Sequence, residues 1–360
     1  MTFARTISSF LLLLALPCGV VVAQATKEPT KPPLAGDAFK NVQVLKDLPE
    51  EQFWATMSFF ADSLGVNCEH CHQNPYEADI KPEKIKARQM IRMVRELNAR
   101  YFDGTQKVTC NSCHQGTTAP AAEPSLDAQH WMNFTQAESQ LPDGASLIAR
   151  YQKLTGVTTA AVPRAERVSY EMTIYLSEAP PRKEFTELTT GGQEQFRMSR
   201  TSEGGTQTWI RDGAAGWVRD ANGWQATDGN EMFDISSEAS SFSWLTLKGI
   251  TGPKTIKMDI ARGRPVAVVE ANDHDERVWL YFDERTGLLL RRRRFFATYF
   301  ADGCSDTEFD DYKRVGPVML PFLVQILNPS GNGLTIRKAK ERVLLRNLDA
   351  KLFTKPESAK

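Results

Sequence analysis

The stretch "VNCEHCHQNP", residues 66–75, decides the structural interpretation of the first third of this chain. Two residues separate Cys68 from Cys71, His72 follows directly, and His70 lies between the two cysteines. Cysteine and histidine at this spacing can bind zinc, form a redox disulfide or hold a covalently attached porphyrin. The rest of the sequence has to distinguish these three possibilities.

A second copy of the pattern, "TCNSCHQG" at residues 109–116, again ends in a histidine. Two thiols can add to the two vinyl groups of a porphyrin when two residues separate them, and the next imidazole then reaches the iron. We therefore predict two covalently bound haem c groups. Their attachment residues are Cys68, Cys71, Cys110 and Cys113, and their proximal iron ligands are His72 and His114.

The alternatives explain less of the pattern. A zinc site would gather all four cysteines in one place and leave the histidine after each pair unexplained. A thioredoxin-like redox pair would precede a helix in a strand–helix unit, which neither motif has around it. His70 is confined between the two attachment cysteines, so we expect it to face solvent rather than to bind iron.

The N-terminus predicts export. Arg5 precedes an apolar run at residues 10–23, and Ala23-Gln24-Ala25 is typical of a cleavage site. We predict a signal peptide over residues 1–25 and a periplasmic or otherwise exported protein. The run is short for a membrane span and Pro17 interrupts it, so membrane association would come only from an uncleaved signal or from a partner. Acidic and basic residues number 44 each, which gives no reason to expect nucleic acid as a partner.

The period of the hydrophobic pattern divides the chain into two domains. We predict a Pro-rich tether over residues 26–37, a helical dihaem domain over 38–118, a linker over 119–141 and a β domain over 142–360. Helices are expected at residues 48–65, where Gly65 provides a stop, and at 81–102, where Pro82 suits the first turn. The second of these should bury an apolar stripe that runs from Ile85 to Tyr101.

Beyond residue 142 the pattern changes to period two, with turn residues between the runs. Strands are expected in segments such as "RVSYEMTIYL", "EQFRMSRT" and "PVAVVEA", and helices at residues 145–156 and 236–249. The predicted fold class is α+β. A small all-helical c-type dihaem module precedes a curved antiparallel β-sheet, a half-barrel, with one or two helices.

The sixth iron ligand decides between electron transfer and an open iron suited to peroxidase chemistry or gas sensing. Met57 and Met90 lie on the apolar faces of the helices that precede the two motifs. Met93 lies three residues further on, and a methionine on such a stripe can equally be core filler. From spacing alone, both interpretations of the methionines stay open.

Residues 38–120 resemble the haem-binding repeat of the cytochrome c subunit bound to photosynthetic reaction centres, on the segments "FKNVQVLKDLPEEQFWATMSFFADSLGVNCEHCH", "KARQMIRMVRELNARYF" and "VTCNSCHQG". The resemblance implies that Met57 is the distal partner of His72 and Met90 that of His114, with Met93 as the alternative to Met90. That family has four motifs and this chain has two, so docking on a reaction centre is not implied.

The second domain resembles exported outer-membrane lipoprotein-carrier proteins, in "LIARYQKLTG", "DGAAGWVRD" and "DDYKRVGPVMLPFLVQI". The resemblance implies a curved sheet around an apolar cavity. Five tryptophans could line such a cavity, although core packing is their more common role: Trp209, Trp217, Trp224, Trp244 and Trp279.

Two local features have ordinary interpretations. The run "LLLRRRRFF" at residues 288–296 predicts a solvated or edge strand protected by charge, with a docking patch for an acidic partner or lipid headgroups as the alternative.

Cys304 has no partner in the mature chain, so we expect a buried or slowly reacting thiol rather than an intermolecular disulfide.

Together these features predict an exported dihaem c-type cytochrome that relays single electrons between redox protein partners. We expect an electron carrier rather than an enzyme, with a haem peroxidase as the enzymatic alternative. The second hypothesis is a periplasmic protein that binds or carries lipid or another apolar ligand and uses its haems to sense redox state.

Overall fold

The computed structural model describes residues 32–120, 141–158, 165–176, 179–192, 194–227, 232, 238–239, 241–298, 300–327 and 333–354. Residues Pro33–Lys360 form one compact unit. The predicted signal peptide, the first half of the tether and nearly all of the linker lie outside the described residues. The proposed domain boundaries therefore stay predictions, and we refer to residues 32–120 as the helical region and to residues 141–354 as the sheet region.

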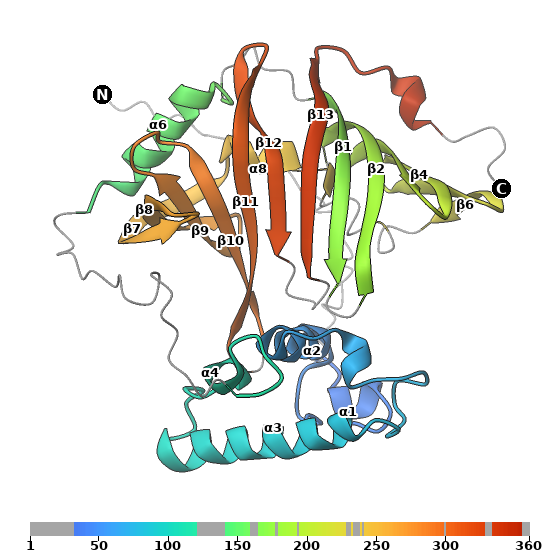
Figure 1. Cartoon of the computed structure of the whole chain (residues 1–360), viewed down its shortest axis with the longest axis vertical. Coiled ribbons are helices and arrows are strands. Elements are labelled where there is room, and N and C mark those ends of the chain that lie inside the picture. Colours follow the sequence, from blue (N-terminus) through green and yellow to red (C-terminus); the bar gives the residue numbers. More distant parts are fainter. Residues whose placement is uncertain are drawn as a thin grey trace, which may run out of the picture. The chain divides into compact units, whose positions relative to one another are not determined.

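The helical region contains two long helices, close to where the sequence predicts them (Figure 1). Helix α2 ends at Gly65, whose backbone is left-handed, and helix α3 begins with Pro82 in its first turn. The elements of this region are α1 (Ala35–Ala38), α2 (Glu50–Leu64), the 3₁₀ turn η1 (Cys68–His70), α3 (Pro82–Tyr101) and α4 (Cys110–His114).

The expectation of an all-helical module is too strong. An isolated β-bridge joins Leu34 to Pro49, and non-helical segments connect η1 to α3 and α3 to α4. These connections carry backbone carbonyls that are not used within a helix, and polar side chains from α3 bind several of them. The non-helical backbone is thus held by long-range contacts instead of by helical hydrogen bonds.

The buried face of α3 differs from the predicted stripe. Ile85 is 39% exposed and Tyr101 is 64% exposed, at the two ends of that stripe. Ile91 and Val94 are buried and pack with Phe59 of α2 in the core of the helical region. The other buried residues of α3 are polar: Lys84, Arg88 and Asn98.

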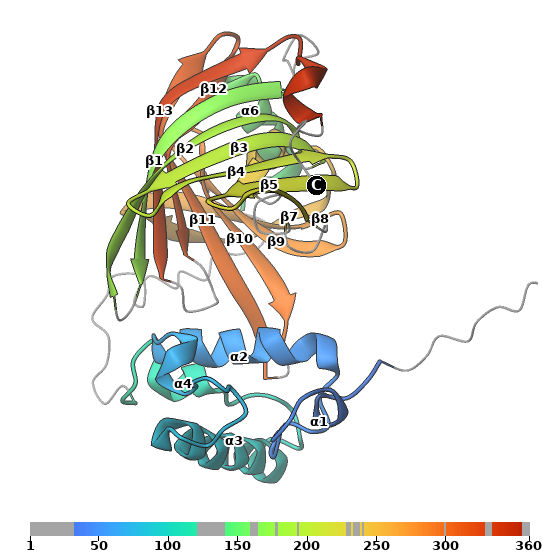
Figure 2. The same cartoon turned by 90° about the vertical axis from the view of Figure 1, so that its right-hand side faces the viewer.

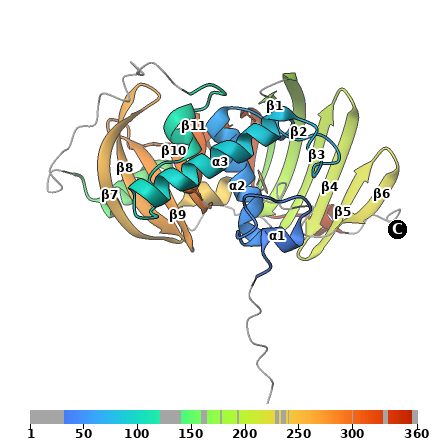
Figure 3. The ribbon, with the colours of Figure 1, turned by 90° about the horizontal axis from the view of Figure 1, so that it is seen from below.

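The sheet region is built on one antiparallel sheet of thirteen strands (Figures 2 and 3). Its order is β6-β5-β4-β3-β2-β1-β13-β12-β11-β10-β9-β8-β7, so the first and last strands of the chain are neighbours inside the sheet. The strands are β1 (Ala165–Leu176), β2 (Ala179–Gly192), β3 (Gln195–Ser202), β4 (Gly205–Asp212), β5 (Ala215–Asp220), β6 (Gly223–Thr227), β7 (Ile250–Ala261), β8 (Arg264–Asp273), β9 (Glu276–Asp283), β10 (Leu289–Ala297), β11 (Asp302–Val315), β12 (Val318–Leu327) and β13 (Leu334–Leu345).

Two helices pack against the sheet, α6 (Gly144–Thr155) and α8 (Ser241–Thr246), and the 3₁₀ turn η3 (Ala350–Phe353) follows the last strand. Asp143 caps α6 by accepting a 2.8 Å hydrogen bond from the backbone N–H of Ser146. Tyr151 of α6 is fully buried and donates its hydroxyl to the carbonyl of Leu245 at 3.0 Å. This bond joins the two helices within the largest apolar cluster of the sheet region.

The turn between β10 and β11 contacts the helical region. Phe300 is fully buried, belongs to the same cluster as Phe59 and lies 5.3 Å, ring centre to ring centre, from Phe60 of α2. Figure 2 shows these two long strands extending toward α2. An aromatic residue of the sheet region therefore completes the core of the helical region.

The arginine run does not form an edge strand. Strand β10 lies between β9 and β11, and each of its four arginines pairs with an acid of β8, β9 or β11. The pairs are Arg291–Glu308, Arg292–Asp273, Arg293–Asp306 and Arg294–Glu276, all between 2.6 and 2.7 Å. Because these charges are neutralised within the sheet, the run offers no free cationic docking patch.

Candidate haem-binding site

The first CxxCH motif folds as a tight turn after α2. The Asn67 side chain accepts a 3.1 Å hydrogen bond from the backbone N–H of His70. The backbone N–H of His72 donates to the backbone carbonyl of Cys68 at 3.0 Å. The turn is the 3₁₀ element η1, which places the second cysteine and the following histidine one turn after the first cysteine. Burial, followed by the nearby carboxylate of Glu83, raises the pKa of Cys71.

The second motif forms the short helix α4. Thr109 and Ser112 make a capping box, in which the Ser112 hydroxyl accepts the backbone N–H of Thr109 at 3.0 Å. Burial raises the pKa of Cys110 to about 11, so its thiol is protonated at neutral pH. Cys68 and Cys113 are exposed, whereas Cys71 and Cys110 are half-buried, so each motif presents one accessible and one sheltered thiol.

The two proximal histidines are held in the same way. Nδ1 of His72 lies 3.0 Å from the carbonyl oxygen of Tyr76, and Nδ1 of His114 lies 3.0 Å from that of Thr117. A carbonyl oxygen only accepts, so Nδ1 carries the hydrogen in both rings and Nε2 keeps its lone pair. This tautomer is the one that an iron ligand needs, and a backbone partner for the other nitrogen is the usual support of a ligating imidazole. The donor set thus fits haem c attachment at both motifs.

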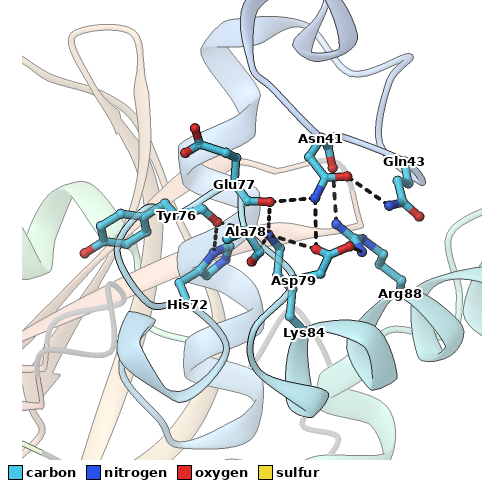
Figure 4. Close-up of polar contacts among 9 residues, drawn as sticks. All are labelled: Asn41, Gln43, His72, Tyr76, Glu77, Ala78, Asp79, Lys84 and Arg88. Carbon is cyan, nitrogen blue, oxygen red and sulfur yellow. Dashed lines mark hydrogen bonds and ion pairs between the residues drawn. The ribbon is translucent and has the colours of Figure 1, made fainter.

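A buried lysine organises the loop after His72 (Figure 4). Nζ of Lys84 donates to the carbonyls of Tyr76, Glu77 and Ala78 at 2.9, 2.9 and 3.0 Å, and lies 3.3 Å from the carboxylate of Asp79. The carbonyl of Tyr76 therefore receives both the lysine and the Nδ1–H of His72. Only 9% of Lys84 is exposed.

The carboxylate of Asp79 also binds side chains from two other segments. Arg88 of α3 binds its carboxylate at 2.8 Å and the carbonyl of Asn41 at 3.2 Å, while the Asn41 amide donates to the other carboxylate oxygen at 2.9 Å. The hydrogen bond from Arg88, aided by Lys84, lowers the pKa of Asp79 to about 2, so the acid is ionised at neutral pH. The sequence patterns gave no signal for this network, because its members are ordinary charged and amide residues in three separate segments.

The residues after the second motif contact the C-terminal end of α2. The backbone N–H of Gly116 donates to the carbonyl of Ser63 at 3.0 Å. The backbones of Gly65 and Gly116 also touch, which leaves no room for a side chain on Gly65. Helix α2 therefore contacts α4 as well as η1, and one helix supports both motifs.

The three candidate methionines differ in their surroundings. Met57 of α2 is half-buried and packs against the helical core, and Met90 of α3 is half-buried without belonging to that cluster. Met93 is 42% exposed. Met90 is thus less exposed than Met93, and the choice between them and the pairing of each methionine with a histidine stay predictions.

Other predictions concern the remaining cysteines and histidines. The described cysteines are free thiols, and within the described ranges no group of three or more histidine, cysteine or acidic side chains is placed to hold a metal ion. His70 is half-buried. Cys304 is exposed, contrary to the expectation of a buried thiol, although desolvation raises its pKa and slows thiolate chemistry.

The sheet region contains a small cavity of about 50 Å³. Two buried acids, Glu166 and Glu238, contribute to its wall, where Arg342 and Arg337 pair with them at 2.8 Å. Of the five tryptophans, Trp244 lines this cavity, whereas Trp209 packs against a core cluster of the sheet.

Across the ranges that the structure describes, no helix has both the length and the apolar character to cross a bilayer.

Comparison with known proteins confirms the resemblance of the helical region. Residues 16–173 match the family described as photosynthetic reaction centre cytochrome C subunit. Cytochrome c-554 of Chloroflexus aurantiacus is 38% identical over 81 residues, which are 21% of this chain and 20% of that protein. The photosynthetic reaction center cytochrome c subunit of Roseobacter denitrificans is 29% identical over 157 residues, 40% of this chain and 38% of that protein. The chain thus contains a segment similar to c-type cytochromes and spans a fifth to two fifths of these relatives.

Two solved structures are similar to part of this chain. A LolA superfamily protein from Nitrosomonas europaea aligns with 59% of this chain and 98% of its own, at 10% identity and a TM-score of 0.44. A putative outer membrane lipoprotein-sorting protein domain from Vibrio parahaemolyticus aligns over 59% and 97%, at 10% identity and a TM-score of 0.39.

Proposed function

We propose that this chain is an exported c-type cytochrome that binds two haem c groups and relays single electrons between redox proteins. The observation that carries the proposal is the matched support of His72 and His114, each with Nδ1 bound to a backbone carbonyl at 3.0 Å. Two attachment cysteines precede each of these histidines. When bound, haem c supplies an iron that cycles between ferric and ferrous states by gaining or losing one electron.

The residues of the chain have separate roles in this proposal. The four cysteines would bond the porphyrins covalently, and the two histidines would bind the irons through Nε2. Met57 and Met90 are the proposed distal ligands, because a thioether closes the iron to substrates and favours electron transfer over enzymatic chemistry. Half-burial of both side chains agrees with this role, since a ligand has to stay out of solvent.

Haem counting tests the proposal. Intact-mass spectrometry of the purified holoprotein should show two covalently added haems, and the pair of substitutions Cys110→Ala and Cys113→Ala should leave one. The matched pair at Cys68 and Cys71 should leave the other, and Cys304→Ala is the control that should leave both. A chain without covalent haem contradicts the proposal, and one haem in the unsubstituted protein contradicts its two-haem form.

A carrier function for a lipid or another apolar ligand is the second candidate. The cavity beside Trp244 favours it, because Val168, Leu188 and Phe309 give it apolar walls. Its volume of about 50 Å³ is far below the several hundred Å³ typical of a ligand pocket, so binding would require the wall to move. Native mass spectrometry of the full chain should detect a co-purified lipid if this function holds, and a lipid-free protein would speak against it.

A further inference from the structure

The two histidines have the same hydrogen bond but different electrostatic surroundings. The carbonyl of Tyr76, which accepts from His72, is also bound by the buried ammonium of Lys84 at 2.9 Å. The carbonyl of Thr117, which accepts from His114, is bound by no charged side chain among the described residues. The Thr117 hydroxyl, a neutral group, donates to the carbonyls of His114 and Ala119 at 2.7 and 2.6 Å. Among the described residues, a buried ammonium thus binds the carbonyl that supports His72, and none binds the carbonyl that supports His114.

We propose that Lys84 is a positioning residue that raises the reduction potential of the haem bound at the first motif above that of the haem bound at the second. This inference rests on the proposed function. It goes beyond that function because it assigns an order to the two haems and names the residue that causes the order.

Two effects of the ammonium act in the same direction. A positive charge close to the site favours the ferrous state, because one-electron reduction lowers the positive charge on the iron. The bond from Lys84 also draws electron density from the Tyr76 carbonyl, which then accepts the Nδ1–H of His72 more weakly. A weaker acceptor makes the imidazole a poorer electron donor and again favours ferrous iron.

The neighbouring charges reduce this effect without removing it. Asp79 lies 3.3 Å from Lys84 and opposes it, but Arg88 binds the same carboxylate at 2.8 Å. The three side chains together carry a net charge of +1. Glu83 and Lys81, which act on the neighbouring Cys71 with opposite signs, add no net charge to this sum. Lys84 and Arg88 are both buried, so solvent screens this charge less than it would screen an exposed one.

The redox step itself is a single electron transfer. With haem bound, a one-electron redox protein would donate the electron to the iron, and no proton would have to move. The donor is oxidised by one electron in the same step. With the potentials ordered as proposed, the haem at the first motif is the first of the two to be reduced.

Spectroelectrochemical titration of the full-length holoprotein tests the inference. Lys84→Met should lower the potential of the first haem by about 59 mV or more, which is a tenfold change in the one-electron equilibrium constant. Lys84→Arg should preserve most of the potential. Lys86→Met removes an exposed charge from the same helix and should change little. Variants that keep only one CxxCH motif bind only one haem, and the potential measured for each variant is therefore assigned to that haem.

Further variants keep the test decisive. If Lys84→Met loses haem, Lys84→Gln keeps a hydrogen-bond donor without the charge and should still lower the potential. Asp79→Asn removes the opposing charge and should raise it. Unchanged potentials in the Lys84 variants that retain both haems overturn the inference and leave the proposed function intact. The absence of covalent haem from the unsubstituted protein would instead contradict the proposed function.

Discussion

Gly65 and Gly116 approach each other so closely that a Cβ on Gly65 would overlap the carbonyl oxygen of Gly116. Gly65 also has a left-handed backbone, with φ of 66°. We predict that Gly65→Ala lowers the free energy of unfolding by about 2 kcal/mol or more, from backbone strain plus overlap. Chemical denaturation followed by circular dichroism measures the loss.

The matched control for this substitution is Gly104→Ala. Gly104 has a similar φ of 76°, but no atom lies within 4 Å of the position that its Cβ would take. The control should therefore lose only about 1 kcal/mol, from backbone strain. Equal losses in the two variants would mean that contact with Gly116 does not constrain the second motif.

The distal ligands can be identified by spectroscopy. Met57→Ala and Met90→Ala should each remove one long-wavelength methionine–iron charge-transfer band from the ferric spectrum. Each should also lower one potential, because a thioether ligand raises the potential of haem iron. The exposed Met93 is the internal control, so Met93→Ala should leave both bands. If a band is lost in the Met93 variant and not in the Met90 variant, the ligand would be Met93, one turn further along α3.

Asp79 makes the helical region sensitive to acid. Its pKa is lowered from 3.8 to about 2 in the folded protein, mainly by Arg88. A lowered pKa stabilises the fold above pH 3.8, and this contribution is lost as the pH falls from about 4 toward 2. Asp79→Asn should lower stability at neutral pH and reduce the loss over that acid range, as denaturation midpoints at several pH values would show. An unchanged acid profile would contradict this assignment.

Phe300 should matter to both regions of the chain. Its ring is fully buried beside Phe60, so Phe300→Ala removes an aromatic side chain from a core to which α2 and α3 also contribute. We expect a loss of about 3–5 kcal/mol in the free energy of unfolding. Phe185, which is 39% exposed, is the control, and Phe185→Ala should cost far less. Similar costs would mean that the contact adds little to stability.

The sequence predicted those elements that local signals specify. Pro82 and Gly65 mark helix ends, so α2 and α3 were placed to within a few residues. The period-two runs likewise located β1, β3 and β8. The spacing of cysteine and histidine predicts both motifs without reference to the fold, because attachment to a porphyrin depends on neighbouring residues alone, and this assignment stays a prediction.

Elements that depend on distant contacts were missed. Strands β11 and β13 are rich in charged residues and were not expected, because their charges pair across the sheet, as Glu308 does with Arg291. The buried face of α3 was misplaced for the same reason. A lysine is usually exposed, so the sequence predicts a surface position for Lys84. Its burial is favourable only because its ammonium binds the carbonyls of the loop after His72.

The position of β13 between β1 and β12 has a consequence for the order of folding. The ion pair of Glu166 with Arg342 is buried and joins positions 176 residues apart, so loop closure across most of the sheet region must precede it. Until β13 inserts, the inward edges of β1 and β12 have no partner, and unpaired edges invite pairing with other chains. The final strand therefore joins two half-sheets into one, and synthesis must pass residue 345 before the aggregation hazard ends.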